Sequence, residues 1–259
     1  MNKSVAAALL LLTACSGEPA ETATPPAQAE AKAPAPQPAA QPRRVEEKGE
    51  LLDFGYSWPA EAAAIAKLDQ RFEAEMAERR AEALRFAQED RADRGPDIPF
   101  HGHYFHKGWA TMGDGGRLLS LAALTQVFTG GAHGNALYDV LLWDRTADEK
   151  IELADLFTDD DGAIAAMTPV YCAGLDAQRA EKRGAPVSPD GPDWMVQCRP
   201  LAESTVAPVD ADGDGRFDLF RVLIEPYEAG AYVEGTYEVD IPVTAELRRM
   251  VKPEFGGSF

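Results

Sequence analysis

The feature that most constrains the fold is a glycine-rich turn between two long apolar segments. Leu118–Phe128 precedes the turn and residues 136–143 follow it, so the pattern predicts two antiparallel strands within a larger sheet. Glycine permits positive φ values, and asparagine tolerates left-handed geometry better than most residues. A turn alone does not require the histidine at its centre. We therefore interpret the turn as a candidate binding loop, formed by Gly130, Gly131, Ala132, His133, Gly134 and Asn135.

The N-terminus predicts export and lipid attachment. Lys3 precedes an apolar run over residues 5–12, which is too short to span a bilayer as a mature helix. Leu12-Thr13-Ala14-Cys15 follows directly and resembles the bacterial lipobox, in which the cysteine is lipidated. We expect residues 1–15 to be a lipoprotein signal segment and Cys15 to anchor the chain in the cell envelope, facing the periplasm. The alternative is an ordinary secretory peptide with a chance cysteine, which would also export the protein.

Composition separates a tether from a folded domain. Residues 16–50 are rich in Ala, Pro, Glu and Gln without an apolar period, which predicts a disordered tether. Residues 51–259 are long enough for a sizeable core, and the absence of a second linker favours a single domain. The formal net charge of −18 disfavours nucleic acid and anionic lipid as partners and would steer a basic protein toward the chain at low salt. The alternative, which the charge by itself favours, is that it serves solubility alone.

The pattern of elements predicts an α+β fold, with an antiparallel sheet packed against a long N-terminal helix and a second helix after the central strands. Pro59 suits a helix start, and Gly95-Pro96 a helix end. Between them, the apolar positions at helical spacing are Ile65, Leu68, Phe72, Met76, Ala83 and Phe86. The second helix is expected over residues 162–180 and a short one from Thr244. Strands are expected over residues 51–57, 100–110, 118–128, 136–144, 150–153, 203–209, 217–225 and 236–241.

Two cysteines remain once Cys15 is assigned to lipid. Cys172 and Cys198 form a pair in an oxidising compartment, which predicts a disulfide. The bond would close a loop that contains the Pro- and Gly-rich residues 184–192, and would contribute roughly 3 kcal/mol through the unfolded state. The absence of a C-x-x-C spacing argues against redox catalysis.

The acidic sequence D-x-D-x-D-G-x-x-D is the sharpest metal-binding signal. Its carboxylates can converge on one calcium ion, with a backbone carbonyl from the position after the glycine. The expected ligands are Asp210, Asp212, Asp214, Arg216 and Asp218. Because a strand follows and the last glutamate of an EF-hand loop is absent, the pattern favours a structural calcium hairpin. The alternative is an unoccupied polar turn.

Histidines supply two further candidate sites. In an extended strand, His101 and His103 share one face and His106 lies on the other, but without a third ligand they are favoured as surface histidines over a transition-metal site. His133 could act as a general base, yet no G-x-S-x-G, Walker or H-E-x-x-H motif accompanies it. A structural or partner-binding role for His133 is therefore favoured over catalysis.

Several motifs resemble one known family. The loop at residues 130–135 is followed by a strand ending in Asp144 and by Ile151-Glu152-Leu153-Ala154-Asp155-Leu156-Phe157. This order resembles the extracytoplasmic domain shared by the lysozyme-sensing anti-sigma factor RsiV and the peptidoglycan deacetylase PdaC. Residues 225–235, EPYEAGAYVEG, resemble that family's proline–tyrosine and tyrosine–glycine segment, which adds Tyr227 and Tyr232 to the candidate binding residues. Residues 51–128 are similar to the family's N-terminal half.

The resemblance implies an α+β domain outside the cytoplasmic membrane, which in the sensing members binds lysozyme. We expect neither the transmembrane helix nor the sigma-factor-binding segment of those members, and the histidine pair of a deacetylase domain does not occur. The resemblance thus favours a non-enzymatic binding domain whose partner is a basic muralytic protein such as lysozyme. The alternatives are a cell-wall glycan-modifying enzyme and a purely structural envelope lipoprotein.

Overall fold

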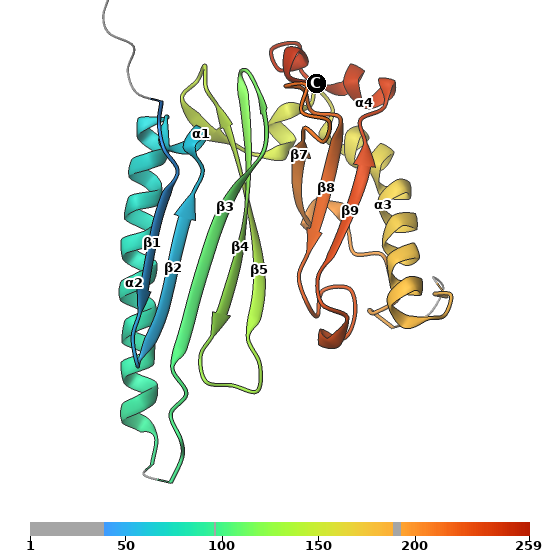
Figure 1. Ribbon diagram of the computed structural model, residues 1–259. Coiled ribbons are helices and arrows are strands. Elements are labelled where there is room, and N and C mark those ends of the chain that lie inside the picture. Colours follow the sequence, from blue (N-terminus) through green and yellow to red (C-terminus); the bar gives the residue numbers. More distant parts are fainter. Residues whose placement is uncertain (1–38, 96, 189–192) are drawn as a thin grey trace, which may run out of the picture. The chain divides into compact units, whose positions relative to one another are not determined.

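The computed structural model describes residues 39–95, 97–188 and 193–259, and Ala39–Phe259 forms one compact unit (Figure 1). The predicted signal segment, the lipidation site Cys15 and most of the predicted tether lie outside the described residues. The tether boundary expected at residue 50 differs from the structure, because strand β1, Arg43–Lys48, already pairs with its neighbour. This edge strand is almost entirely exposed and its residues are mostly charged. Its composition therefore could not be told from that of a linker.

The larger sheet has six strands in the order β1-β2-β3-β4-β5-β6. After β1 they are β2 Leu52–Trp58, β3 His103–Gly115, β4 Leu118–Phe128, β5 Asn135–Asp144 and β6 Glu149–Ile151. Neighbours are antiparallel except β2 and β3, which run parallel because the chain returns through helices α1, Ala60–Ala63, and α2, Ala66–Asp93. The expected antiparallel sheet is therefore a mixed one.

Helix α2 covers one face of the larger sheet. The inward side chains of β2 are all buried, in agreement with their alternating pattern, and they are Leu52, Phe54, Tyr56 and Trp58. Phe72 of α2 packs against Trp109 of β3 with ring centroids 5.0 Å apart. Burial of each such large side chain contributes on the order of 2–3 kcal/mol. The predicted helix stripe holds at Leu68 and Phe72, whereas Phe86 remains 45% exposed.

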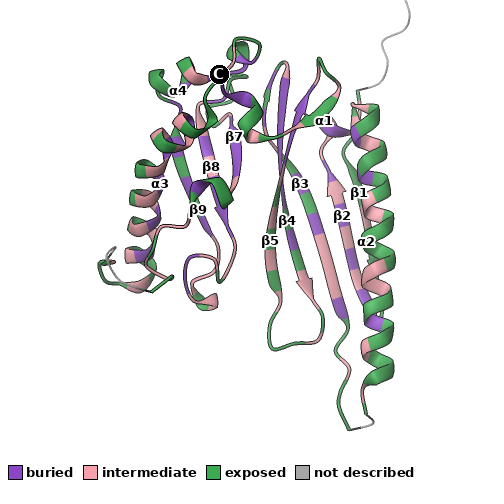
Figure 2. Ribbon diagram, turned by 180° about the vertical axis from the view of Figure 1, so that it is seen from behind, coloured by how far each residue is buried: buried purple, intermediate pink, exposed green. Residues whose placement is uncertain are grey.

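The strands after residue 204 form a second, three-stranded sheet, which the sequence analysis did not separate from the first. It has the order β7-β8-β9, with β7 Thr205–Val209, β8 Leu219–Ile224 and β9 Tyr237–Pro242. Helix α3, Asp160–Arg183, lies beside this sheet (Figure 2). Its buried residues Met167, Tyr171 and Leu175 belong to the core of the smaller sheet. Short helices complete this part: α4 Ala245–Met250, and the 3-10 helices η1 Leu153–Leu156, η2 Leu201–Glu203, η3 Tyr232–Glu234 and η4 Gly256–Ser258.

Strands β4 and β5 contribute to both cores. Leu118 and Leu142 pack in the core of the smaller sheet, whereas Leu121 and Leu141 belong to the core under α2. Because successive side chains of a strand point to opposite faces, a strand covered on both sides reads as a continuous apolar run. Over residues 39–95, 97–188 and 193–259, no helix combines the length and the apolar composition that crossing a bilayer requires.

Candidate functional site: a loop and a tyrosine segment in contact

The glycine-rich loop is anchored to the end of α2. Gly130 adopts φ +87°, a left-handed geometry that favours glycine, and its carbonyl oxygen accepts a hydrogen bond from Arg94 at 3.4 Å. Arg94 is itself paired with Asp90 at 2.9 Å. At Gly134 a Cβ atom would stand 2.1 Å from the Tyr104 hydroxyl oxygen, so a larger residue would force the tyrosine or the loop to shift. The loop therefore has a fixed path over the end of the sheet.

Residues 225–235, between β8 and β9, reach the same end of the molecule (Figure 1). Helix α3 holds this segment: Arg179 donates to the Ala229 carbonyl oxygen at 2.8 Å, and Arg183 pairs with Glu234 at 2.9 Å. Tyr227 has φ +73°, an unusual value for a residue with a side chain. We infer that the surrounding contacts keep Tyr227 in this orientation.

The two motifs meet through a cluster of three rings, the His133–tyrosine cluster, formed by His133, Tyr227 and Tyr232. The His133 ring stacks on that of Tyr232 with centroids 3.7 Å apart, and the Tyr232 hydroxyl donates to the Gly134 carbonyl oxygen at 2.6 Å. His133 Nδ1 lies 2.9 Å from the same carbonyl oxygen, so it must carry a proton. In the neutral ring Nε2 is then the acceptor, and the Tyr227 hydroxyl donates to it at 3.2 Å.

The cluster is partly exposed at the surface of the molecule. Tyr227 is 51% exposed and the neighbouring Val233 is 91% exposed, so the cluster offers rigid apolar surface with a polar edge. Within the part of the chain that the structure describes, the hydrogen-bond partners of His133 are a tyrosine and a backbone carbonyl. No carboxylate orients the imidazole there, as it would in a catalytic triad.

The acidic loop brings three of its five predicted ligands together. Carboxylate oxygens of Asp210, Asp212 and Asp214 lie within 4.8 Å of one another. The Asp218 carboxylate instead accepts the backbone N–H of Ala211 at 2.9 Å. For the predicted ligand Arg216, the side chain donates to the carbonyl oxygen of the C-terminal Phe259, and its backbone N–H donates to Asp214 at 2.9 Å. The three converging carboxylates have the oxygen chemistry of a calcium site.

The three strand histidines do not converge. His103 is buried and its Nε2 lies 3.0 Å from Asp90, whereas His106 Nε2 lies 2.9 Å from Asp53. His101 is exposed and precedes β3. Among the described residues, these histidines belong to no group with metal-binding geometry. The structure thus gives His103 and His106 carboxylate partners, where the sequence analysis expected surface histidines.

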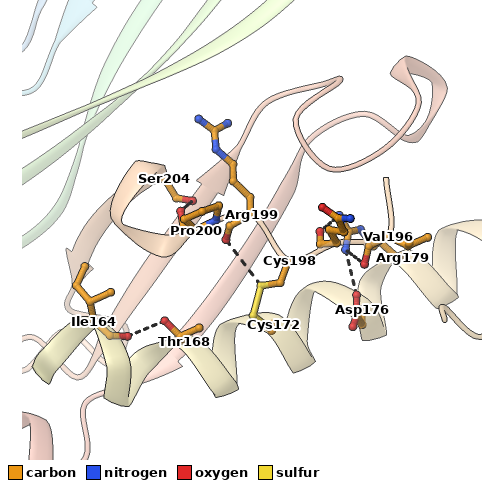
Figure 3. Close-up of a disulfide and its surroundings, with 11 residues drawn as sticks. Ile164, Thr168, Cys172, Asp176, Arg179, Val196, Cys198, Arg199, Pro200 and Ser204 are labelled. Carbon is orange, nitrogen blue, oxygen red and sulfur yellow. Dashed lines mark hydrogen bonds and ion pairs between the residues drawn. A yellow bond between two sulfur atoms is a disulfide. The ribbon is translucent and has the colours of Figure 1, made fainter. Parts of the chain in front are cut away.

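The predicted disulfide is present, and it joins α3 to the segment before η2 (Figure 3). The Cα atoms of Cys172 and Cys198 are 5.5 Å apart. Two turns along α3, Arg179 donates to the Val196 carbonyl oxygen at 3.2 Å and pairs with Asp176 at 3.1 Å. The disulfide and Arg179 together hold residues 196–198 against α3.

Lys107 is a buried lysine that no sequence motif indicated. Lys107 of β3 is 7% exposed, and its Nζ lies 2.6 Å from Glu75 and 2.8 Å from Asp139. Burial and the Glu75 carboxylate raise the pKa of the nearby Tyr56 hydroxyl. The position of Lys107 in the sequence could have predicted its burial, because alternate residues of a strand share a face and Lys107 lies between Phe105 and Trp109 on the inward face.

Comparison with known families agrees with the resemblance in part of the chain. Residues 45–136 match the family model described as Deacetylase PdaC. This segment is PdaC-like. The match includes the loop at residues 130–135, whereas the tyrosine segment lies outside it. No curated protein matches the chain.

Two solved structures are similar to this chain. A DUF3298 family protein from Pseudomonas aeruginosa PAO1 is 18% identical, with a TM-score of 0.54, over 83% of this chain and 95% of that one. A DUF3298 family member from Bacteroides fragilis is 17% identical, with a TM-score of 0.47, over 83% and 94%. At this identity the first likeness shows a shared fold, which extends beyond the PdaC-like segment.

Proposed function

We propose that the protein is a lipid-anchored, non-enzymatic envelope protein that binds a basic muralytic protein such as lysozyme through the His133–tyrosine cluster. The supporting observation is that the two motifs of the family resemblance, far apart in sequence, contact each other. Tyrosine is enriched among the residues that dominate protein interfaces. The net charge of −18 would steer a basic partner toward the chain at low salt.

A pull-down with lysozyme at low and high salt tests the proposal. We expect capture at low salt, and a loss of at least tenfold in affinity for Tyr227→Ala and for Tyr232→Ala. Val170→Ala is the matched control, because Val170 is 45% exposed but lies on α3. Absence of capture at low salt would exclude lysozyme as the partner, and equal losses in the control would exclude the cluster as the binding surface.

The second candidate function is deacetylation of a cell-wall glycan. It is favoured by the description of the matching family, and by the hydrogen bond between His133 and the exposed Tyr227 hydroxyl. The measurement is release of acetate from peptidoglycan by the purified chain. Release that disappears in His133→Ala would support this function over binding alone, and no release from either chain would leave it unsupported.

Calcium binding by the acidic loop is a separate, structural part of the proposal. The three converging carboxylates would hold the ion and stabilise the loop between β7 and β8. We expect the melting temperature to fall in a chelator and to recover with added calcium. Asp212→Asn should abolish this dependence, whereas a chelator effect of equal size in that variant would place the ion elsewhere.

Anchoring through Cys15 is tested by fractionation of cells. The wild-type chain should be recovered with membranes, and a Cys15→Ala chain should not carry lipid. Recovery of lipid on Cys15→Ala would show that the lipobox assignment is wrong. If binding, deacetylation and calcium dependence all fail, a purely structural envelope role becomes the better interpretation.

A further inference from the structure

Strand β5 has a free edge over part of its length. Strand β6 pairs with β5 only at residues 142–144. Residues 135–141 therefore have β4 on one side and, within the described part of the chain, no hydrogen-bonded strand on the other. The Tyr138 N–H points to the free side, because it donates to the Glu225 carboxylate at 2.8 Å. Outward-pointing backbone groups recur at every second residue, so those of Ala136 and Val140 share this direction. Within the described ranges, no hydrogen-bond partner satisfies these groups.

Two clefts flank this edge. The first has a volume of about 790 Å³ and a polar and aromatic lining that includes Arg71, Glu78, Arg79, Lys107, Trp109 and Asp139. The second has a volume of about 460 Å³ and a mainly apolar lining that includes Leu142, Ile151, Leu153, Phe157, Ile164 and Val206. Tyr138, Asp139 and Val140 of β5 line both. The edge therefore separates a polar cleft from an apolar one.

We propose that this edge of β5 accepts an extended peptide segment of a partner as an added strand. Successive side chains of a strand point to opposite faces. A peptide paired with β5 would therefore place one set of side chains in the polar cleft and the alternate set in the apolar cleft. In this mode of recognition, main-chain hydrogen bonds supply affinity and the flanking pockets supply specificity.

Glu225 marks where the added strand would bind. Its carboxylate oxygen accepts a hydrogen bond from the Tyr138 N–H. In a paired strand, a backbone carbonyl oxygen would accept that hydrogen bond. An incoming peptide carbonyl would replace it, and the released carboxylate would then need a cation. In the polar cleft, Glu78 and Glu225 have no cationic partner among the described residues, whereas Arg71 is the one cation there without an anionic partner. The unpaired side chains of this cleft therefore carry a net negative charge.

These charges define the peptide. It carries basic side chains toward the polar cleft and large apolar side chains, at alternate positions, toward the apolar cleft. The net charge of −18 acts in the same direction. The inference depends on β5 and its clefts and not on lysozyme, so a failed lysozyme pull-down leaves it standing.

The probe is a labelled nine-residue peptide that alternates lysine and valine, added to the full chain. We expect saturable binding by fluorescence anisotropy, with slower amide hydrogen exchange at Ala136 and Val140. Only every second peptide N–H would point toward β5, so two peptides are compared, one N-methylated at the odd-numbered amides and one at the even-numbered amides. One of the two should bind at least tenfold more weakly than the unmethylated peptide, and the other less than threefold more weakly. No binding, unchanged exchange at both amides, or equal sensitivity to the two methylation patterns would overturn the proposal.

Variants of β5 provide the second arm. Val140→Pro removes an outward N–H and leaves the ladder to β4 intact, because proline is tolerated on the solvent side of an edge strand. We expect at least tenfold weaker binding of the peptide. Val140→Thr, which keeps the N–H and the branched shape, is the matched control and should stay within threefold of the wild type. Should Val140→Pro prove unfolded by circular dichroism, the two methylated peptides decide the question.

Discussion

Replacing Arg179 by methionine should lower the free energy of unfolding by about 3 kcal/mol. The Arg179 side chain has no exposed surface. Its guanidinium donates to the carbonyl oxygens of Ala229 at 2.8 Å, Gln197 at 3.0 Å and Val196 at 3.2 Å, and to Asp176 at 3.1 Å. A hydrogen bond from a charged group contributes about 1.5–3 kcal/mol.

The sum of four such bonds overstates the loss. Asp176 is partly exposed and can be solvated, and the Ala229 carbonyl oxygen keeps a 3.3 Å bond from Arg183. Methionine also retains much of the apolar contact of the arginine stem. Two bonds lost in full, at about 1.5 kcal/mol each, give the stated magnitude.

Urea unfolding followed by tryptophan fluorescence measures this loss. For a domain of this size, about 3 kcal/mol corresponds to a melting temperature lower by roughly 6–12 °C. Arg85→Met is the matched control: the side chains of Arg85 and Glu89 are 54% and 55% exposed, so it should cost less than about 0.5 kcal/mol. A loss below about 1 kcal/mol for Arg179→Met, or one no larger than in the control, would refute the reasoning.

Three further changes have defined outcomes. Gly134→Ala should cost about 1–3 kcal/mol in urea unfolding, because its Cβ would lie 2.1 Å from the Tyr104 hydroxyl oxygen, and less in a Tyr104→Phe background. Cys172→Ser should cost roughly 3 kcal/mol, and a reducing agent should then leave the melting temperature of that variant unchanged. The Arg117 hydrogen bonds lower the pKa of Asp144, so their stabilisation is present above pH about 4 and is lost as the pH falls through the folded value. Asp144→Asn should weaken this acid dependence, and an unchanged slope in an acid titration would contradict the assignment.

Local signals predicted many elements well. The strand Leu118–Phe128 has the predicted ends, because glycine turns bound an apolar run. The second helix is capped by Asp159, whose side chain accepts the Gly162 N–H, and it ends at Gly184 with φ +66°. These signals depend only on residues that are adjacent in the sequence, so the sequence alone is enough to identify them.

Features that depend on distant residues could not be predicted in this way. The parallel pairing of β2 with β3 depends on where α2 returns the chain, and the burial of Lys107 depends on carboxylates from α2 and β5. The glycine-rich turn pointed to His133, and a family resemblance pointed to Tyr227 and Tyr232. Their contact spans most of a hundred residues and needs both sheets in place.

The parallel register of β2 and β3 also sets the order in which the larger sheet assembles. Strands β3 to β6 form a meander, whose short connections cost little loop-closure entropy. Pairing β2 with β3 instead closes a loop that contains all of α2, and such non-local pairings slow folding. We therefore expect the meander to form early and β2 to join it late, after α2 has shortened the distance between the two strands.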